Sequence, residues 1–246
     1  MKLSVLMPVY NEQASVHRAL KQALAVDYPC DVEFVVVDDG STDGTAAELD
    51  AFTDERLRVV HHPRNRGKGA AIRTAAEAAG GDYVVILDAD LEYDPSDIPA
   101  LVKPVLEERA TVVYGNRQFG SHSAYSFWYV LGNRGVTLAA NIIFNSYISD
   151  VETCFKLMPL DLYRRLDIRS TGFGMEAEVT GKLLRRRLRP YEVPISYHAR
   201  SREDGKKITA WDGVEALAIL VRERVRRLPA HEQVPSRRRP SGDERS

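Results

Sequence analysis

Three acidic side chains follow a short apolar segment in the first half of the chain. Asp88 and Asp90 come directly after residues 83–87, and Glu92 follows two residues later. Alternate residues of an extended chain point to one side, so these carboxylates can converge where the strand ends. Mg²⁺ and Mn²⁺ prefer such oxygen ligands and commonly share them with phosphates. The spacing predicts a metal site at these three residues, and the alternative is a solvated acidic turn before Pro95.

Two further polar segments fit contact with a nucleotide. Asp38 and Asp39 end the apolar run 32–37, where a carboxylate can accept hydrogen bonds from a base or ribose. The glycines on either side of Lys68 permit close backbone approach, and the lysine can meet phosphate. Each segment also has a purely structural interpretation. The acidic pair can begin the next helix, and the glycine turn lacks the phosphate-loop spacing of nucleoside-triphosphate enzymes.

The elements that must position these residues alternate along the first half of the chain. Apolar runs rich in branched residues predict strands at 3–9, 32–37, 57–60, 83–87 and 111–114. Helical spacing predicts helices at about 13–25, 42–52 and 70–79. This pattern is typical of an α/β fold with a Rossmann-like, mainly parallel central sheet flanked by helices. Ligands bind at the carboxyl ends of such strands, where the polar motifs lie.

The alternation weakens beyond residue 120. We expect helices at about 130–145, 175–187 and 211–228, and strands at about 153–158 and near Val193. The last helix has an apolar face that fits either a core contact or an interfacial helix, formed by Val214, Leu217, Ala218, Val221, Val225 and Leu228. Residues 1–228 are therefore predicted to form one domain. Residues 229–246 are rich in Pro, Arg and Ser and are predicted to be a disordered tail.

Composition and charge exclude several classes of protein. Thirty-four basic residues against thirty-five acidic ones give a net charge of −1, which does not favour a nucleic-acid partner. No stretch provides the about 20 apolar residues of a spanning helix, and residues 3–9 fit a strand better than a signal peptide. Cys30 and Cys154 form neither a metal spacing nor a disulfide framework, so we expect a cytoplasmic protein. The lack of a Gly-x-Gly-x-x-Gly motif after the first strand argues against a dehydrogenase.

The order of these motifs resembles that of the family 2 inverting glycosyltransferases, which have the GT-A fold. The resemblance covers roughly residues 1–225 and runs through Pro8-Val9-Tyr10-Asn11-Glu12, Val37-Asp38-Asp39-Gly40-Ser41, Gly67-Lys68-Gly69 and Asp88-Ala89-Asp90. It implies a nucleotide-sugar half at about 1–120 and an acceptor half at about 121–228. It also implies that the nucleotide-sugar donor is bound by Pro8, Tyr10, Glu12, Asp39, Lys68 and Asp88, with Asp88 and Asp90 at the metal and diphosphate.

Later motifs resemble the polyprenyl-phosphate and dolichyl-phosphate mannosyl- and glucosyltransferases. They lie at residues 90–95, 114–117, 131–134, 149–156 and 193–197. The resemblance implies inverting, metal-dependent transfer of mannose or glucose from a GDP- or UDP-hexose to a polyprenyl phosphate. Glu92 stands where the mannosyl enzymes usually have Gln, which leaves the sugar open. The alternatives are a transferase acting on a soluble hydroxyl acceptor, a saccharide or small molecule, and a non-catalytic nucleotide-binding module.

Four basic residues from Arg117 onward predict a site for an acceptor phosphate. They are Arg117, Arg134, Arg202 and Lys206, whose alternative role is to keep the surface soluble. The basic last helix and the aromatic residues 125–129 also fit peripheral association with the cytoplasmic face of a membrane.

The reaction itself requires a nucleophile of adequate strength. A phosphomonoester with a second pKa of about 6 is ionised at neutral pH and can attack without a protein base. A hydroxyl acceptor needs a base, for which Asp150 and Glu176 are the candidates. Either could instead orient the acceptor-site arginines, and Glu176 could simply favour a helix N-terminus. The predicted catalytic set is therefore Asp90, Arg117, Asp150 and Glu176.

Overall fold

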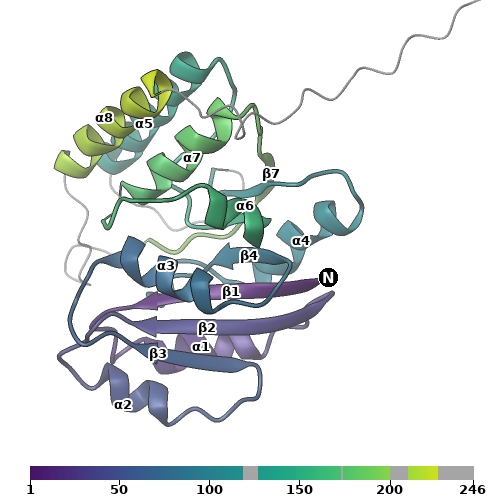
Figure 1. Ribbon diagram of the computed structural model, residues 1–246, viewed down its shortest axis with the longest axis vertical. Coiled ribbons are helices and arrows are strands. Elements are labelled where there is room, and N and C mark those ends of the chain that lie inside the picture. The colour runs from purple at the N-terminus through teal and green to yellow at the C-terminus, as the bar shows by residue number, and fades with distance from the viewer. Residues whose placement is uncertain (119–126, 173, 200–209, 227–246) are drawn as a thin grey trace, which may run out of the picture.

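The computed structural model describes residues 1–118, 127–172, 174–199 and 210–226. Over these residues, seven strands form one sheet in the order β3-β2-β1-β4-β6-β5-β7 (Figure 1). The pairs β1/β2, β1/β4, β2/β3 and β5/β7 are parallel, whereas β6 runs antiparallel to β4 and β5. The bounds are β1 Lys2–Val9, β2 Asp31–Asp38, β3 Leu57–His61, β4 Tyr83–Ile86, β5 Val113–Asn116, β6 Lys156–Pro159 and β7 Tyr191–Pro194. The predicted mainly parallel α/β sheet is confirmed.

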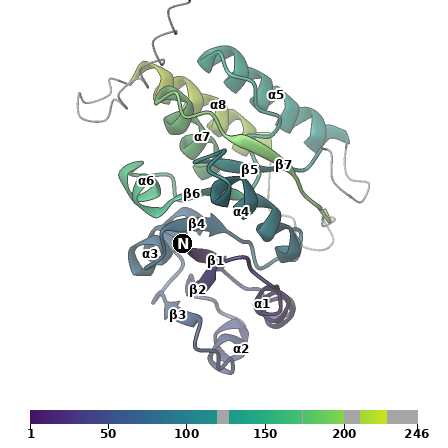
Figure 2. The same ribbon diagram turned by 90° about the vertical axis from the view of Figure 1, so that its right-hand side faces the viewer.

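Helices cover both faces of this sheet. Figure 2 shows α1 and α4 on one face and α3 and α6 on the other, with α5, α7 and α8 grouped at one end. Their bounds are α1 Val16–Leu24, α2 Thr45–Asp50, α3 Lys68–Ala78, α4 Ile98–Leu106, α5 Phe127–Phe144, α6 Leu160–Arg165, α7 Met175–Arg185 and α8 Ala210–Val225, with a 3₁₀ turn η1 at Pro95–Asp97. The predicted helices exist, and α4 and α6 are additional. Pro99 and Pro104 within α4 obscure its helical pattern in the sequence.

Two apolar clusters hold these layers together. The larger one lies on both faces of the sheet and includes the fully buried residues Leu6 of β1, Phe34 of β2 and Ile72 of α3. Burial on both faces explains why the parallel strands appear in the sequence as continuous apolar runs. The smaller cluster joins α5, α7 and α8 through Ala140, Ala177 and Leu220. Each fully buried Leu or Ile contributes about 1.5–3 kcal/mol to folding.

Helix α8 does not turn its predicted apolar face to the core. It buries Ala216, Ile219 and Leu220, while Trp211, Val214 and Val221 are exposed. Of the two interpretations that the sequence left open for this face, the core contact is therefore wrong. The short residue Ala216 and the backbone of Gly181 in α7 allow the helices to pack closely, which leaves the larger apolar side chains outside.

Glycines on either side of Lys68 allow residues 170–171 to lie directly against the start of α3. Gly67 has φ +91°, a conformation that L side chains rarely adopt. The amide of Gly69 donates to the Thr171 carbonyl at 2.8 Å, and a Cβ on Gly69 would overlap the Ser170 carbonyl oxygen. This contact holds Lys68 against the second half of the chain.

Gly69→Ala tests this close approach. Overlap with backbone cannot be relieved by a rotamer change, so we expect the free energy of unfolding to fall by about 1–3 kcal/mol. Gly213→Ala in α8 is the matched control, because a Cβ there meets open space. It should raise the free energy of unfolding by up to about 1 kcal/mol. Equal effects of the two substitutions in urea unfolding would contradict the proposed packing.

Candidate active site

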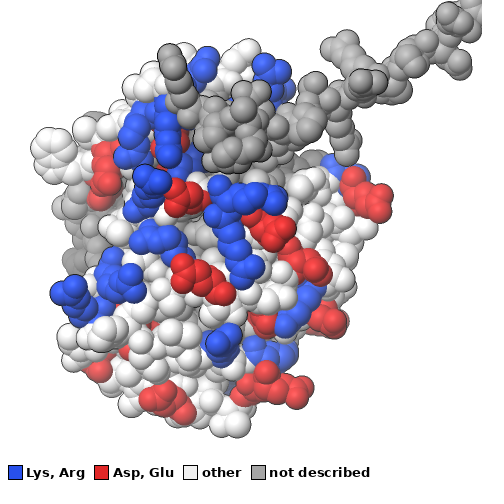
Figure 3. Space-filling view, viewed as in Figure 1, with Lys and Arg blue, Asp and Glu red and all other residues white. Residues whose placement is uncertain are grey.

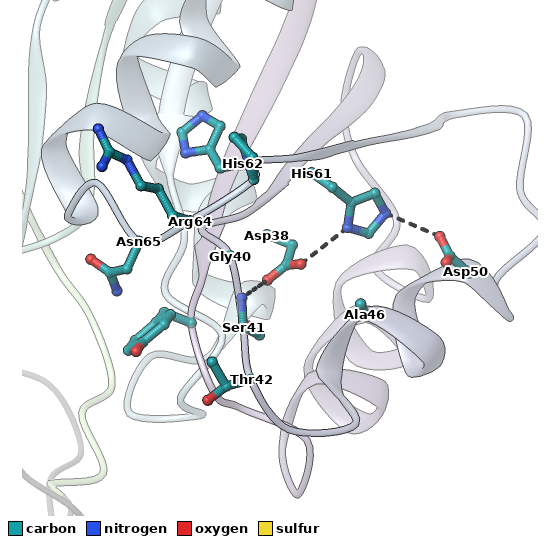
Figure 4. A pocket seen from close by; sticks show the side chains of 12 residues that line it. Asp38, Gly40, Ser41, Thr42, Ala46, Asp50, His61, His62, Arg64 and Asn65 are labelled. Carbon is teal, nitrogen blue, oxygen red and sulfur yellow. Dashed lines mark hydrogen bonds and ion pairs between the residues drawn. The ribbon is translucent and has the colours of Figure 1, made fainter.

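A polar pocket of about 520 Å³ opens at the carboxyl ends of β1, β2 and β3 (Figure 4). Its walls come from the residues after these strands and from α2. They are Tyr10, Asp38, Gly40, Ser41, Thr42, Ala46, Asp50, His61, His62, Pro63, Arg64 and Asn65. Ligands of open α/β sheets bind at this edge. Of the residues predicted to bind the nucleotide sugar, Tyr10 lines this pocket.

Asp38 and His61 form the inner wall of this pocket. They face each other in the β2/β3 register, and His61 Nδ1 lies 3.1 Å from Asp38 Oδ2. The second carboxylate oxygen of Asp38 accepts the Ser41 amide at 3.0 Å, and His61 Nε2 lies 3.1 Å from Asp50 Oδ1 (Figure 4). Hydrogen bonding to Asp38 above all, and also to Asp50, raises the pKa of His61. The pocket thus presents fixed acceptors and a readily protonated imidazole.

Asp39 has a different role from the one that the resemblance implied. Its carboxylate is buried and accepts the backbone amides of Arg66 and Gly67, the latter at 2.7 Å. His62 Nδ1 lies 2.7 Å from the same group. Asp39 therefore fixes the loop that ends at Lys68, and its neighbour Asp38 lines the pocket.

Pro8 and Glu12 also act on the scaffold around the pocket. Pro8 lies within β1 opposite Val37 of β2. The Glu12 carboxylate accepts the Ser15 hydroxyl at 2.5 Å, and its amide donates to the Thr45 hydroxyl at 2.9 Å. These contacts tie the starts of α1 and α2 to the pocket edge.

Lys68 joins the two halves of the chain. As the first residue of α3 it places Nζ 2.9 Å from Asp88 Oδ2 and 2.9 Å from Glu176 Oε1. Burial opposes its charge, but Asp88 and Glu176 raise the pKa of Lys68 well above its usual range. Three residues that the sequence singled out separately therefore form one partly buried ionic cluster.

The predicted metal ligands do not all converge. The Glu92 carboxylate is buried and accepts the Tyr197 hydroxyl at 2.6 Å. Among the residues that the structure describes, no group of three His, Cys, Asp or Glu side chains is arranged to hold a metal ion. Asp88 and Asp90 remain at the end of β4. Two carboxylates fit Mg²⁺ or Mn²⁺, because such ions commonly complete their coordination with substrate phosphate and water.

Arg117 and Asp150, both predicted to act in the reaction, form a bidentate pair. Arg117 Nε and Nη2 lie 2.5 and 2.8 Å from the two Asp150 oxygens, and Asn133 of α5 donates to Asp150 at 3.0 Å. Burial opposes ionisation of Asp150, but Arg117 overcomes this and lowers its pKa. The guanidinium also stacks 4.8 Å from the centre of the Tyr197 ring. Asp150 therefore orients Arg117, one of the two roles that the sequence left open.

The remaining predicted acceptor residues do not join this pair in the described structure. Arg134 is exposed on α5, and Arg202 and Lys206 lie outside the described residues. Residues that were not predicted lie nearby instead. Burial raises the pKa of Glu152 to about 7, and the buried Lys156 donates to the carbonyls of Val151 and Thr153. In the sequence, only their position within the motif 149–156 could have indicated that Glu152 and Lys156 belong to the site.

With polar side chains gathered at the carboxyl ends of parallel strands, the chain has the architecture of α/β enzymes that bind ligands at this edge. The family model for glycosyl transferase family 2 matches residues 4–166, and the chain belongs to this family. It is a glycosyltransferase with the GT-A fold. The suspected family and fold are confirmed.

Three known proteins illustrate this relationship. The Haloferax volcanii low-salt glycan biosynthesis hexosyltransferase Agl6 is 31% identical over 206 residues, covering 82% of this chain and 49% of its own length. The Rhizobium johnstonii dodecaprenyl-phosphate galacturonate synthase is 33% identical over 123 residues, covering 48% and 36%. The chain thus spans half or less of each relative. Mycobacterium tuberculosis glucosyl-3-phosphoglycerate synthase, with Mn²⁺, UDP-glucose and phosphoglyceric acid, shares the fold (TM-score 0.67, 23% identity, 91% and 79% covered).

Arg117→Ala tests the buried pair. It leaves the Asp150 carboxylate buried without its main partner, so we expect the free energy of unfolding to fall by about 3–5 kcal/mol. Adding Asp150→Asn should recover part of this loss. Arg109→Ala is the control, because its pair with Glu107 is exposed and should contribute at most about 1 kcal/mol.

The same pair predicts a pH dependence. Because the folded state lowers the pKa of Asp150, the pair stabilises the protein above the unfolded pKa of about 3.9, and this stabilisation is lost as pH falls through the lower folded value. Urea unfolding between pH 7 and pH 3 should therefore show a smaller acid-induced loss in the Arg117→Ala, Asp150→Asn double variant than in the wild type. Parallel losses would contradict the assignment.

Proposed function

We propose that this glycosyltransferase moves a neutral hexose, mannose or glucose, from a nucleotide sugar to a polyprenyl phosphate with inversion. The observation that carries the donor half is that the loop held by Asp39, which continues from the pocket walls at Arg64 and Asn65, leads directly to Lys68 and its partners Asp88 and Glu176. The pocket can take the nucleoside, and the cluster lies where its diphosphate would extend. UDP-glucose and Mn²⁺ in the structurally similar synthase support this arrangement.

The donor diphosphate would be held by charges already fixed in place. Asp88 and Asp90 would hold Mg²⁺ or Mn²⁺, which would offset the negative charge of the departing nucleoside diphosphate. Lys68 is positioned by Asp88 and Glu176 before any ligand arrives, so little reorganisation is needed. The same lysine keeps Glu176 in an ion pair.

On the acceptor side, Arg117 would bind the attacking phosphate. Asp150 and the Tyr197 ring hold its guanidinium in one orientation, which suits it for planar recognition of phosphate oxygens. An ionised phosphate needs no protein base. Asp150 is then not needed as a base, which agrees with its role in orienting Arg117. The relatives include a dodecaprenyl-phosphate galacturonate synthase, which supports a lipid phosphate acceptor.

An exposed apolar surface on α5 and α8 supports a lipid acceptor and peripheral membrane association. Its side chains form one stripe on each of two helices that pack together, Phe127, Leu131, Leu138 and Ile142 on α5 and Trp211, Val214, Leu217, Val221 and Val225 on α8. Exposure reaches 78% at Trp211 and 72% at Ile142. Arg134, Arg222 and Arg224 flank the stripes and suit anionic headgroups.

Other surfaces fit this assignment. No helix in the described part of the chain is long and apolar enough to cross a membrane. On the face shown in Figure 3, Lys and Arg lie beside Asp and Glu, so this face offers no broad basic surface for nucleic acid. A soluble phosphorylated acceptor is the second candidate, because the structurally similar synthase binds phosphoglyceric acid.

A transfer assay with UDP- and GDP-sugars tests the reaction. We expect turnover with polyprenyl phosphate and Mg²⁺ or Mn²⁺, abolished by chelation and reduced at least about a hundredfold by Asp90→Ala, since metal contacts at diphosphate contribute several kcal/mol. Asp167→Ala, an exposed carboxylate change, is the control. Transfer to soluble alcohols with no turnover of any lipid phosphate would contradict the proposed acceptor.

Vesicle flotation tests the apolar surface. Ile142→Glu combined with Val221→Glu should reduce binding to anionic vesicles about tenfold or more, because each change removes an apolar contact and adds like charge. Leu106→Glu is the matched control, since Leu106 is an exposed apolar residue on the distant helix α4. Equal binding of both variants and the wild type would exclude this surface as the membrane contact.

A further inference from the structure

Three buried oxygen atoms beside the Lys68 cluster have no hydrogen-bond partner among the described residues. They are Glu152 Oε1, Thr153 Oγ1 and Glu176 Oε2. Thr153 is 0% and Glu176 4% exposed. Proteins rarely leave buried polar atoms unsatisfied, because these atoms lose their water without receiving a replacement. Three such atoms within two short segments therefore need an explanation.

These atoms belong to one group. Glu152 and Thr153 are adjacent in the turn before β6, and Glu176 lies in the first turn of α7. After burial, the charge of Glu176 is the strongest influence that raises the pKa of Glu152. Lys156 is also affected by both carboxylates and donates to the Thr153 carbonyl. The oxygens without a partner thus belong to two carboxylates that influence each other's charge and to Thr153, the chain neighbour of Glu152.

The neighbouring cations are committed elsewhere. Arg117 makes its bidentate pair with Asp150, and Lys68 is shared by Asp88 and Glu176. Lys156 Nζ donates to two backbone carbonyls and lies 5.0 Å from the Tyr114 ring centre. Among the described residues, none of these cations donates a hydrogen bond to Glu152. The group is therefore rich in acceptors and acidic in character.

We propose that Glu152, Thr153 and Glu176 bind hydroxyl groups of the transferred sugar, and that Glu152 makes the enzyme select neutral hexoses over uronic acids. The inference rests on the proposed function and deepens it. Lys68 links Glu176 directly to Asp88, so these acceptors lie next to the diphosphate end of the donor. Sugar hydroxyls donate hydrogen bonds to carboxylate oxygens. A sugar carboxylate would instead meet like charge.

The protonation of Glu152 should modulate this selection. Burial and the charge of Glu176 raise the pKa of Glu152, so this carboxyl keeps its proton to a higher pH than an ordinary glutamate. The charged groups around it are Glu176 of α7, Lys156 of β6, Asp150 of the same turn and Arg117 beyond β5. Discrimination against a uronic acid should therefore be stronger at pH 8 than at pH 6.

Calorimetric binding without an acceptor provides the test. The whole chain is titrated, in the presence of Mn²⁺, with two series of ligands. One series is UDP, UDP-glucose and UDP-glucuronate, and the other is GDP, GDP-mannose and GDP-mannuronate. The wild type should bind the neutral sugar of its preferred nucleotide more tightly than either the uronate or the bare diphosphate. Glu152→Gln keeps the shape of the side chain and should reduce the preference for the neutral sugar over the uronate by about tenfold. Thr153→Val should weaken binding of the neutral sugar by about tenfold.

Glu223→Gln is the matched control. Glu223 of α8 is a buried carboxylate that also has an oxygen without a hydrogen-bond partner in the described structure, but it belongs to the α7/α8 contact. Its substitution should leave sugar selectivity unchanged. Unaltered selectivity in both Glu152→Gln and Thr153→Val, with thermal unfolding confirming folded protein, would overturn the inference alone. A wild type that binds no nucleotide sugar would refute the proposed function and the inference together.

Discussion

The ion pairs of Lys68 are the interaction on which the site depends. Its ammonium group connects Asp88, at the end of β4, with Glu176, at the start of α7, so it joins the strand-end crevice to the second half of the chain. Removing one partner from such a buried cluster leaves an uncompensated charge, which makes its geometry restrictive. The Asp39 loop and the contact of Gly69 with residues 170–171 both serve to hold this lysine in place.

A second constraint is the way in which charged side chains near Lys68 are neutralised. The chain pairs Arg117 with Asp150, and the Glu92 carboxylate accepts the Tyr197 hydroxyl. Tyr197 touches both, since it stacks on Arg117 and donates to Glu92. The residues nearest to the expected reaction are thus fixed by neighbours from distant segments. Among the described buried side chains of this region, oxygens of Glu152, Thr153 and Glu176 have no hydrogen-bond partner.

Local sequence pattern predicted the strands and the place of the site, because apolar runs and the polar residues that end them are local features. It could not determine which of Asp38 and Asp39 lines the pocket, since adjacent residues at a strand end face opposite ways and only the β3 register places His61 beside Asp38. The contact of Glu92 with Tyr197 was beyond the local pattern for a similar reason. Tyr197 is 105 positions away, and no spacing within residues 88–92 indicates that contact.

Helix α5 connects the apolar surface with the acceptor side of the site. Its exposed face carries Leu138 and Ile142, while Asn133 on the same helix donates to Asp150 and thereby helps to hold Arg117. A polyprenyl phosphate must keep its chain in a bilayer while its phosphate reaches a fixed guanidinium. In the proposed reaction, α5 would meet the apolar phase with its exposed face and brace the Arg117–Asp150 pair through Asn133, which would satisfy both demands. A small soluble acceptor would need only the second, so the exposed stripes of α5 and α8 favour the lipid.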